Sequence, residues 1–261
     1  MKIEDIFPKG FVSSPNNSGP FPEAPVAIVI HFTAGGSGAS SAAWLKNPDS
    51  KASAHVVVDY DGKIIPVVHP FLRAWHAGSS QLMGITGCNN FTLGIEVANP
   101  GPLTRNVVDG SMKTIFNKAW DGAFVTAVRG LETRYYASYT EAQFVAVKEL
   151  CQLFCQLYPS IESSMIVGHE HISPGRKVDP GPAWDWSRFD DMIELRGSMM
   201  RDFLIQHYIE INGHDLGEID GIFGPKSFAA LKALTGESLT KLTDADRVRL
   251  IKDLRKRRPK L

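Results

Sequence analysis

Val26-Ala27-Ile28-Val29-Ile30-His31 is an unbroken apolar run that ends in a histidine. Most of its residues are β-branched, and no polar residue alternates with them. This pattern is typical of a strand that is buried on both faces of a sheet. Helices must then cover both faces, which favours an α/β fold. Open α/β sheets bind ligands at the carboxyl ends of their strands, so His31 stands where a functional site is expected.

Further strands are predicted on the C-terminal side of this run. His55–Tyr60 and Lys63–Val68 form a predicted hairpin, because the Asp61-Gly62 pair between them is a strong short-range turn signal. Phe91–Val97 is another apolar strand. The sheet therefore contains at least one hairpin beside its buried strand, which predicts a mixed sheet and not a purely parallel one.

Helical patterns separate these strands. A short helix is expected around Ala42–Leu45, before the stop signal Asn47-Pro48. Thr140–Gln143 has the Thr-x-x-Gln form of a capping box and opens a helix that Pro159 ends. Strands that alternate with helices predict an α/β domain with a mixed central sheet flanked by helices. Residues 99–139 have mixed composition and receive no assignment.

The character of the chain changes near residue 194. Three helices are predicted, at 199–211, at 226–234 and from 244 to about 257, with a tight loop at Asp220–Pro225. We therefore expect an α/β domain at 1–193, which carries His31, and a small all-α domain at 194–261. Such a unit is near the lower limit for an independent core, which leaves open that it leans on its neighbour.

Composition excludes several classes of protein. The 28 Lys and Arg balance the 28 Asp and Glu, so no global charge indicates nucleic acid as a partner. The three cysteines cannot all pair with one another, and Cys151 and Cys155 fit a buried helix face better than a redox or metal site. No stretch approaches the roughly 18 apolar residues of a membrane span. The start of the sequence has no apolar signal region, so we expect synthesis in the cytoplasm and, for any outside role, delivery by a pore, a secretion system or lysis.

The loop Gly168–Pro182 is rich in proline and glycine and carries His169, Lys177 and Asp179. Such a loop is fixed in shape without burying apolar surface, and it is poor material for a core. Together with His31, it offers two imidazoles and one carboxylate, a set that leaves zinc an open position for water. Each histidine alone is more typical of a structural, hydrogen-bonded residue. The combination with Lys177 and Asp179 in one loop weakens that interpretation, and spacing alone leaves both open.

The motifs in chain order resemble the zinc-dependent N-acetylmuramoyl-L-alanine amidases. That family includes bacterial cell-wall amidases, phage lysins and the related peptidoglycan recognition proteins. The resemblance covers about residues 24–190, whereas residues 99–139 look longer than the family core. The segments that carry it are His31–Ala34, Ser53–His55, Trp75–Gly78, Gly94–Glu96 and the loop 168–182.

The resemblance implies the metal and the chemistry. By position, His31, His169 and Asp179 match the ligands of one Zn²⁺ per chain. Glu96 matches the acidic residue that serves as general base, and Lys177 matches a lysine that stabilises the oxyanion. The implied reaction is hydrolysis of the amide bond between N-acetylmuramic acid and L-alanine in peptidoglycan.

Three further residues match positions that line the substrate cleft of the family. These are His55, Trp75 and His76. Substrate contact and structural packing are both compatible with their positions. The expected partners are peptidoglycan or muropeptides, and the sequence gives no indication of an oligomeric state.

The C-terminal unit resembles a small helical peptidoglycan-binding domain through the loop-helix segment Gly217–Phe228. We therefore expect a wall-degrading or wall-remodelling amidase. One alternative is a non-catalytic peptidoglycan recognition module, which would have no need of zinc. The other is a cytoplasmic amidase that recycles small muropeptides. The missing signal region at the start of the sequence favours it, and the wall-binding unit argues against it.

Overall fold

The computed structural model describes residues 1–129, 132–193, 199–257 and 259. Its centre is a sheet with the strand order β14-β2-β8-β3-β4. The first four strands are parallel, and β4 pairs antiparallel with β3, so the expected mixed sheet is confirmed. The bounds are β14 Ile166–Gly168, β2 Ala27–Phe32, β8 Thr92–Val97, β3 Val56–Val58 and β4 Ile64–Pro66.

Strand β2 lies in the middle of the parallel part, between β14 and β8. Its residues from Ala27 to His31 are all buried, as predicted from the unbroken apolar run. The predicted hairpin is also present, although β3 and β4 are shorter than the sequence pattern. The turn between them needs a glycine, because Gly62 has φ +83° and an added Cβ would lie 2.8 Å from the carbonyl oxygen of Ala142.

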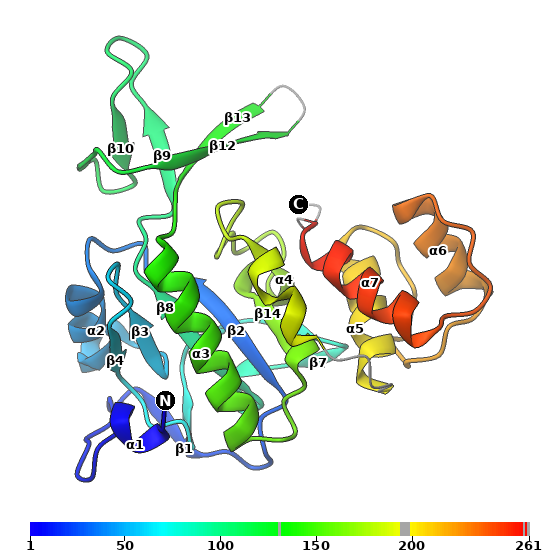
Figure 1. Ribbon diagram of the computed structural model, residues 1–261, viewed down its shortest axis with the longest axis horizontal. Helices are drawn as coiled ribbons and strands as arrows, with labels where there is room; N and C mark the ends of the chain where they lie inside the picture. Colours follow the sequence, from blue (N-terminus) through cyan, green and yellow to red (C-terminus); the bar gives the residue numbers. More distant parts are fainter. Residues whose placement is uncertain (130–131, 194–198, 258, 260–261) are drawn as a thin grey trace.

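Helix α3, Glu141–Leu157, covers one face of the sheet (Figure 1). Its capping box is formed as predicted, since Thr140 accepts from the amide of Gln143 and the Gln143 side chain accepts from the amide of Thr140. Ile28 and Ile30 of β2 pack with Val147 and other apolar residues of this helix. Helix α2, Gly38–Lys46, contacts β3 and β4 and confirms the short helix expected near residue 42.

The C-terminal helices α5 Met199–Ile211, α6 Pro225–Thr235 and α7 Asp244–Arg255 lie beside the central domain (Figure 1), where α5 contacts both α6 and α7, and α7 contacts the 3-10 turn Trp186–Met192. Their bounds agree with the predicted helices to within about two residues, the usual margin for helix ends. Ala27 and Val29 of β2 share one buried cluster with Leu204 and Tyr208 of α5. The core is thus continuous across the expected boundary at residue 193. Residues 194–198, at that boundary, lie outside the described residues.

Residues 102–137, which received no sequence assignment, form a second sheet with the order β11-β10-β9-β13-β12. We call it the inserted sheet, and Figure 1 shows it projecting from the central domain. Leu103, Met112 and Ala137 form its small core. Its strands are β9 Pro102–Arg105, β10 Met112–Thr114, β11 Ala119–Trp120, β12 Phe124–Arg129 and β13 Glu132–Ala137.

Smaller elements complete the chain. A short helix, α4 His169–Ile172, follows β14 directly. Among the described residues, no helix combines the length and the hydropathy that a membrane span requires. The remaining elements are α1 Ile3–Ile6, β1 Asn17–Pro20, β5 Leu72–Ala74, β6 Gln81–Leu82, β7 Ile85–Thr86 and 3-10 turns at Pro48–Ser50, Cys88–Asn90, Ser163–Met165 and Trp186–Met192.

Candidate metal centre and active site

Three elements bring His31, His169 and Asp179 together. His31 lies near the carboxyl end of β2, and His169 follows β14, the parallel strand beside it. The register pairs Ile30 with Gly168, so each histidine stands one residue beyond a paired position. Asp179 comes from the loop after α4. The sheet therefore positions the two histidines, and the loop positions the carboxylate.

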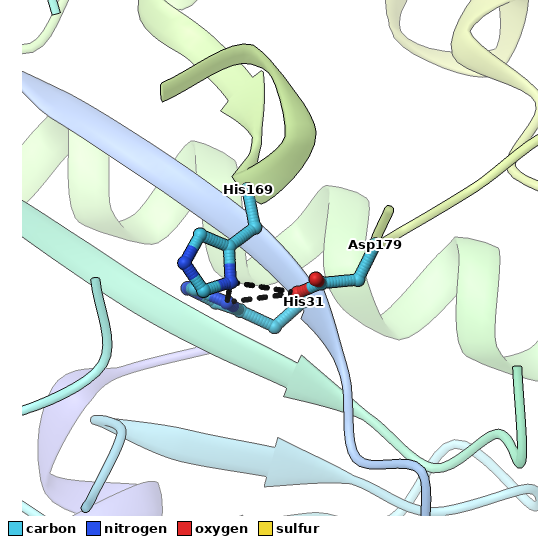
Figure 2. Close-up of side chains that lie close together, drawn as sticks. All are labelled: His31, His169 and Asp179. Carbon is cyan, nitrogen blue, oxygen red and sulfur yellow. Dashed lines mark hydrogen bonds and ion pairs between the residues drawn. The ribbon is translucent and has the colours of Figure 1, made fainter. Parts of the chain in front are cut away.

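The three side chains point toward one another (Figure 2). His31 Nδ1 lies 2.8 Å from His169 Nδ1 and 3.2 Å from Asp179 Oδ2, and His169 Nδ1 lies 2.9 Å from the same oxygen. Ligands about 2.0–2.2 Å from a tetrahedral zinc ion stand about 3.3–3.6 Å apart. The observed triangle is a few tenths of an ångström smaller, so a slight outward movement accommodates an ion. Two nitrogens and one oxygen suit zinc, and the residues fit the group that the sequence motifs imply.

Each imidazole has a second partner on its far nitrogen. His169 Nε2 lies 3.1 Å from the carbonyl oxygen of Ala77, and His31 Nε2 lies 3.0 Å from His76 Nδ1. His76 Nε2 in turn lies 3.3 Å from the carbonyl oxygen of Thr92. With protons on the Nε2 atoms, the network is satisfied and both ligand Nδ1 lone pairs stay free for a metal. The neighbouring residues His76 and Ala77 therefore orient both candidate ligands.

Burial and neighbouring groups keep His31 and Asp179 in the forms that bind a metal. The pKa of His31 is lowered to about 4, mainly because the ring is buried and also because His169 is near. Burial alone would raise the pKa of Asp179, but its interactions with the rings of His169 and His31 outweigh burial and hold that pKa below its usual range. A neutral imidazole and an ionised carboxylate are metal-binding forms.

Glu96 lies on β8 in register with His31 on β2. Its Oε2 is buried without a hydrogen-bond partner among the described residues. Burial and the charge of Asp179 raise the pKa of Glu96 to about 8, against an opposing effect of Lys177. An unpartnered carboxyl that changes protonation near neutral pH beside a metal site is suited to proton transfer.

Lys177 precedes Asp179 by two residues and is half-buried. Its charge lowers the pKa of both Glu96 and His31, which places the ammonium group near both. The loop that presents it is held by Arg176, whose guanidinium donates to the Ala77 and Ser79 carbonyls and to the Ser173 hydroxyl. The sequence motifs did not point to Arg176, although it joins the loop to the segment that orients the histidines.

The other three predicted residues have different surroundings. His55 is fully buried, and its ring nitrogens contact the amide of Gly94 and the carbonyl of Leu72, contacts that belong to structural packing. Trp75 is half-buried, and its indole donates to the Ser18 hydroxyl. His76 is buried between His31 and Thr92. An added Cβ at Gly94 would lie 2.5 Å from the His76 ring, so a glycine is required at this point of the motif.

Comparison with known proteins agrees with this geometry. Residues 22–182 match the family model for N-acetylmuramoyl-L-alanine amidase. The chain is 33% identical over 139 residues to 1,6-anhydro-N-acetylmuramyl-L-alanine amidase AmpD of Haemophilus influenzae, covering 53% of this chain and 57% of the relative. It is 30% identical over 168 residues to N-acetylmuramoyl-L-alanine amidase AmiD of Escherichia coli, covering 62% and 50%. The chain thus spans little more than half the length of these relatives.

Solved structures match over more of the chain. That of E. coli AmiD, in complex with the substrate anhydro-N-acetylmuramic acid-L-Ala-D-γ-Glu-L-Lys, covers 95% of this chain and 91% of its own, with a TM-score of 0.52 and 20% identity. AmpDh3 of Pseudomonas aeruginosa in complex with anhydromuramic pentapeptide covers 95% and 88%, with a TM-score of 0.51 and 21% identity. At these identities, the likeness concerns the fold alone. The region that the family model matches contains every residue of the candidate site, and this chain belongs to the N-acetylmuramoyl-L-alanine amidase family.

Proposed function

We propose that the protein is a zinc-dependent amidase that hydrolyses the bond between the lactyl group of N-acetylmuramic acid and L-alanine in peptidoglycan or its fragments. The convergence of His31, His169 and Asp179 beside an unpartnered Glu96 is the observation that carries the proposal. Membership of the amidase family supports it. We further propose that these three residues hold one zinc ion per chain.

Zinc held by His31, His169 and Asp179 would lower the pKa of a bound water to about 7 and would polarise the amide carbonyl as a Lewis acid. Glu96 accepts the proton of the attacking water and delivers it to the leaving nitrogen of L-alanine. Lys177 balances the negative charge that develops on the carbonyl oxygen. Water is consumed, the carbon–nitrogen bond breaks, and the products are a lactyl carboxylate and a free amine.

The residues around the site prepare it for this reaction. His76 and Ala77 fix the ring orientations of His31 and His169. Burial raises the pKa of Glu96, which makes its ionised carboxylate a stronger base than an exposed one. A module that only recognised peptidoglycan would need neither feature, which favours the enzyme over that alternative.

Digestion of purified sacculi, followed by mass spectrometry, tests the proposal. We expect free stem peptides with an L-alanine amino terminus and glycan strands that keep the lactyl carboxylate. New reducing sugar ends, or cuts inside the peptide, would contradict an amidase of this specificity.

Substrate size distinguishes two versions of this function. The AmpD relatives are named for 1,6-anhydro-N-acetylmuramyl-L-alanine, which supports a recycling amidase that acts on small fragments. We favour action on the cell wall, because Gly217–Phe228 resembles a peptidoglycan-binding segment. Faster release of peptide from sacculi than from an equimolar soluble muropeptide would support the wall as substrate, and the reverse would favour recycling.

A further inference from the structure

The inserted sheet reaches back over the candidate active site. A cavity of about 480 Å³ is lined by Glu96, by Thr33 just beyond the ligand His31, by Trp44 of α2 and by Phe116 of the inserted sheet. Trp44 is 56% exposed and Phe116 is 65% exposed. Two large aromatic side chains that stay open to solvent on the rim of a cavity of this size are typical of a ligand site.

The position of Phe116 is fixed by its turn. Phe116 lies between β10 and β11, where the amide of Thr114 donates to the carbonyl of Lys118 and the amide of Asn117 donates to the carbonyl of Thr114. Asn117 adopts φ +58°, a left-handed conformation that asparagine tolerates better than most residues. The turn therefore presents Phe116 outward on a short, closed loop.

The sheet as a whole is anchored to the central domain. The buried Asn99 side chain donates to the carbonyls of Ala137 and Ser138 and accepts from the amide of Gly101, which ties the two chain crossings together. Trp120 of β11 also lies against Tyr60, with ring centroids 6.4 Å apart. These contacts hold the sheet on the central domain, where Phe116 lines the same cavity as Trp44.

Charge decides which part of a muropeptide this cavity suits. Among the described residues that line it, Glu96 is the only charged one and none is cationic. The carboxyl group of muramic acid forms the scissile amide, so the saccharide part of the substrate is uncharged. A stem peptide with a γ-linked glutamate, in contrast, has a free carboxylate. Without a cationic side chain, the lining offers no partner for the carboxylate of a stem peptide, whereas a neutral sugar needs none.

A second cavity, unlike the first, has cationic side chains in its lining. It measures about 920 Å³ and is lined by Val178, next to the ligand Asp179, by Arg105 and Arg134 of the inserted sheet, and by Asp109. Arg134 also pairs with Glu132. Guanidinium groups suit the carboxylates of a stem peptide. The two cavities lie beside different ligands of the same candidate centre, as the two sides of one scissile bond require.

We propose that Trp44 and Phe116 form a saccharide subsite, in which the two rings hold the N-acetylmuramyl ring while its lactyl amide lies at the metal centre. This inference rests on the proposed amidase function. It adds that the inserted sheet recognises the saccharide part of the substrate. Thr33 and Ser40 line the same cavity, and a hydroxyl side chain can exchange hydrogen bonds with the hydroxyls of a sugar.

The test uses the full chain loaded with zinc and two substrates with the same scissile amide. One is N-acetylmuramoyl-L-Ala-D-γ-Glu-L-Lys, and the other is the D-lactyl peptide that lacks the sugar. Wild-type protein should prefer the first by roughly 10- to 100-fold in kcat/KM. Trp44→Ala and Phe116→Ala should each raise KM for the first substrate by roughly 10-fold, with kcat little changed, and should leave the second unaffected.

Phe71→Ala is the matched control, because Phe71 is an aromatic residue with 50% exposure that lies beside Tyr158 and lines neither cavity. Zinc content and melting temperature should equal those of the wild type in all three variants. Equal losses on both substrates, or no loss on either, would overturn the saccharide subsite. Loss of discrimination between long and short stem peptides would overturn it in favour of a peptide subsite.

Binding of the uncharged amide of N-acetylmuramic acid, measured by calorimetry, separates this inference from the proposed function. Wild-type protein should bind this probe, and Trp44→Ala and Phe116→Ala should weaken binding by roughly 10-fold. Binding without hydrolysis of either substrate would uphold the subsite and refute the amidase. Hydrolysis without saccharide binding would refute the subsite and uphold the amidase.

Discussion

His31 and Glu96 occupy paired positions on the neighbouring parallel strands β2 and β8. Paired residues of adjacent strands project from the same face of a sheet, so a candidate ligand and a candidate general base stand side by side by backbone geometry alone. The hydrogen bonds of the parallel sheet fix this separation. The catalytic proposal therefore rests on rigid elements, whereas Lys177 and Asp179 depend on a loop.

Removal of a ligand should remove the metal. In His31→Ala or Asp179→Ala, zinc should fall from about one ion per chain to nearly none, and turnover should fall with it, because two protein ligands hold zinc far less tightly than three. Plasma emission spectrometry of the purified variants measures the metal. His214→Ala is the control, since His214 lies outside the cluster and should keep its zinc. Full turnover by metal-free wild-type protein would refute a zinc mechanism.

Glu96→Gln and Lys177→Met should separate chemistry from metal binding. Each should keep its zinc yet lose turnover by roughly 10²- to 10³-fold, the usual contribution of a positioned acid-base or oxyanion group. Lys148→Met offers a matched control, because Lys148 pairs with Asp191 away from the site. Near wild-type rates in either active-site variant would exclude the role assigned to that residue.

The raised pKa of Glu96 makes a prediction about stability. The carboxyl has a pKa of about 8 in the folded chain against 4.5 ordinarily, so the folded state binds the proton more tightly. Its contribution to the free energy of unfolding is full below pH 4.5 and is lost as the pH rises to about 8. The measured quantity is the difference in melting temperature between metal-free wild type and metal-free Glu96→Gln. If the shift is absent, this difference should be the same at pH 8.5 as at pH 5.

If the shift is present, Glu96→Gln should gain stability relative to wild type steadily between pH 5 and pH 8. Differential scanning calorimetry in buffers of equal ionic strength measures it. The buried histidines act equally in both chains and cancel in the comparison. Added zinc should shrink the difference, because a nearby cation favours the ionised carboxylate.

The sequence predicted the parts of the structure that carry strong local signals. The apolar run before His31, the turn at Asp61-Gly62 and the capping box at Thr140 each have one physical interpretation, and each was confirmed. The motifs around His31 and Asp179 also predicted a three-ligand group, and the structure brings these side chains within hydrogen-bond distance. The chemical roles of these residues remain predictions.

Other features had no such signal. The strands of the inserted sheet are short, and apolar residues such as Val107 and Phe116 lie exposed on its turns, so no alternation marks a buried face. Ala77 acts through its backbone carbonyl, which the residue type does not reveal. The helical period predicted α5, but periodicity does not reveal that the apolar face of α5 joins the buried cluster that also contains Ala27 and Val29 of β2.

The position of His76 distinguishes the two roles that the sequence left open. If His76 orients His31, then His76→Phe should weaken zinc binding about 10- to 100-fold, because the ligand loses the acceptor for its Nε2 proton. Competition with a fluorescent chelator measures this affinity. His76→Asn should restore part of it, since the amide oxygen can accept the same hydrogen bond.

A residue that contacted only substrate would behave differently. Its replacement would raise KM at saturating zinc and leave the affinity for zinc unchanged. His55→Phe is a suitable comparison, because His55 bonds to the backbone of Gly94 and Leu72 and to neither ligand. It should lower the melting temperature without lowering zinc affinity.

Truncation tests whether the C-terminal helices are a targeting module or part of the catalytic core. Leu204, Ile205 and Tyr208 of α5 are fully buried in the cluster that also holds Ala27 and Val29 of β2. Each such side chain contributes about 1.5–3 kcal/mol by burial, and a whole domain is stable by only about 5–15 kcal/mol. A chain that ends at Asp191 should therefore lose activity equally on sacculi and on a soluble muropeptide, with a lower melting temperature.

A point substitution can separate wall binding from the stabilisation that the buried residues of α5 provide. Ile222 is 69% exposed in the segment that resembles a peptidoglycan-binding domain, so Ile222→Ala should leave the core and the melting temperature unchanged. If the segment binds the wall, the variant should release less peptide from sacculi yet keep its rate on the soluble substrate, because a second attachment raises the effective concentration only on a polymer. Pull-down with sacculi measures the binding directly. A truncated chain that kept its melting temperature and its soluble rate would show instead that the helices form a separable module.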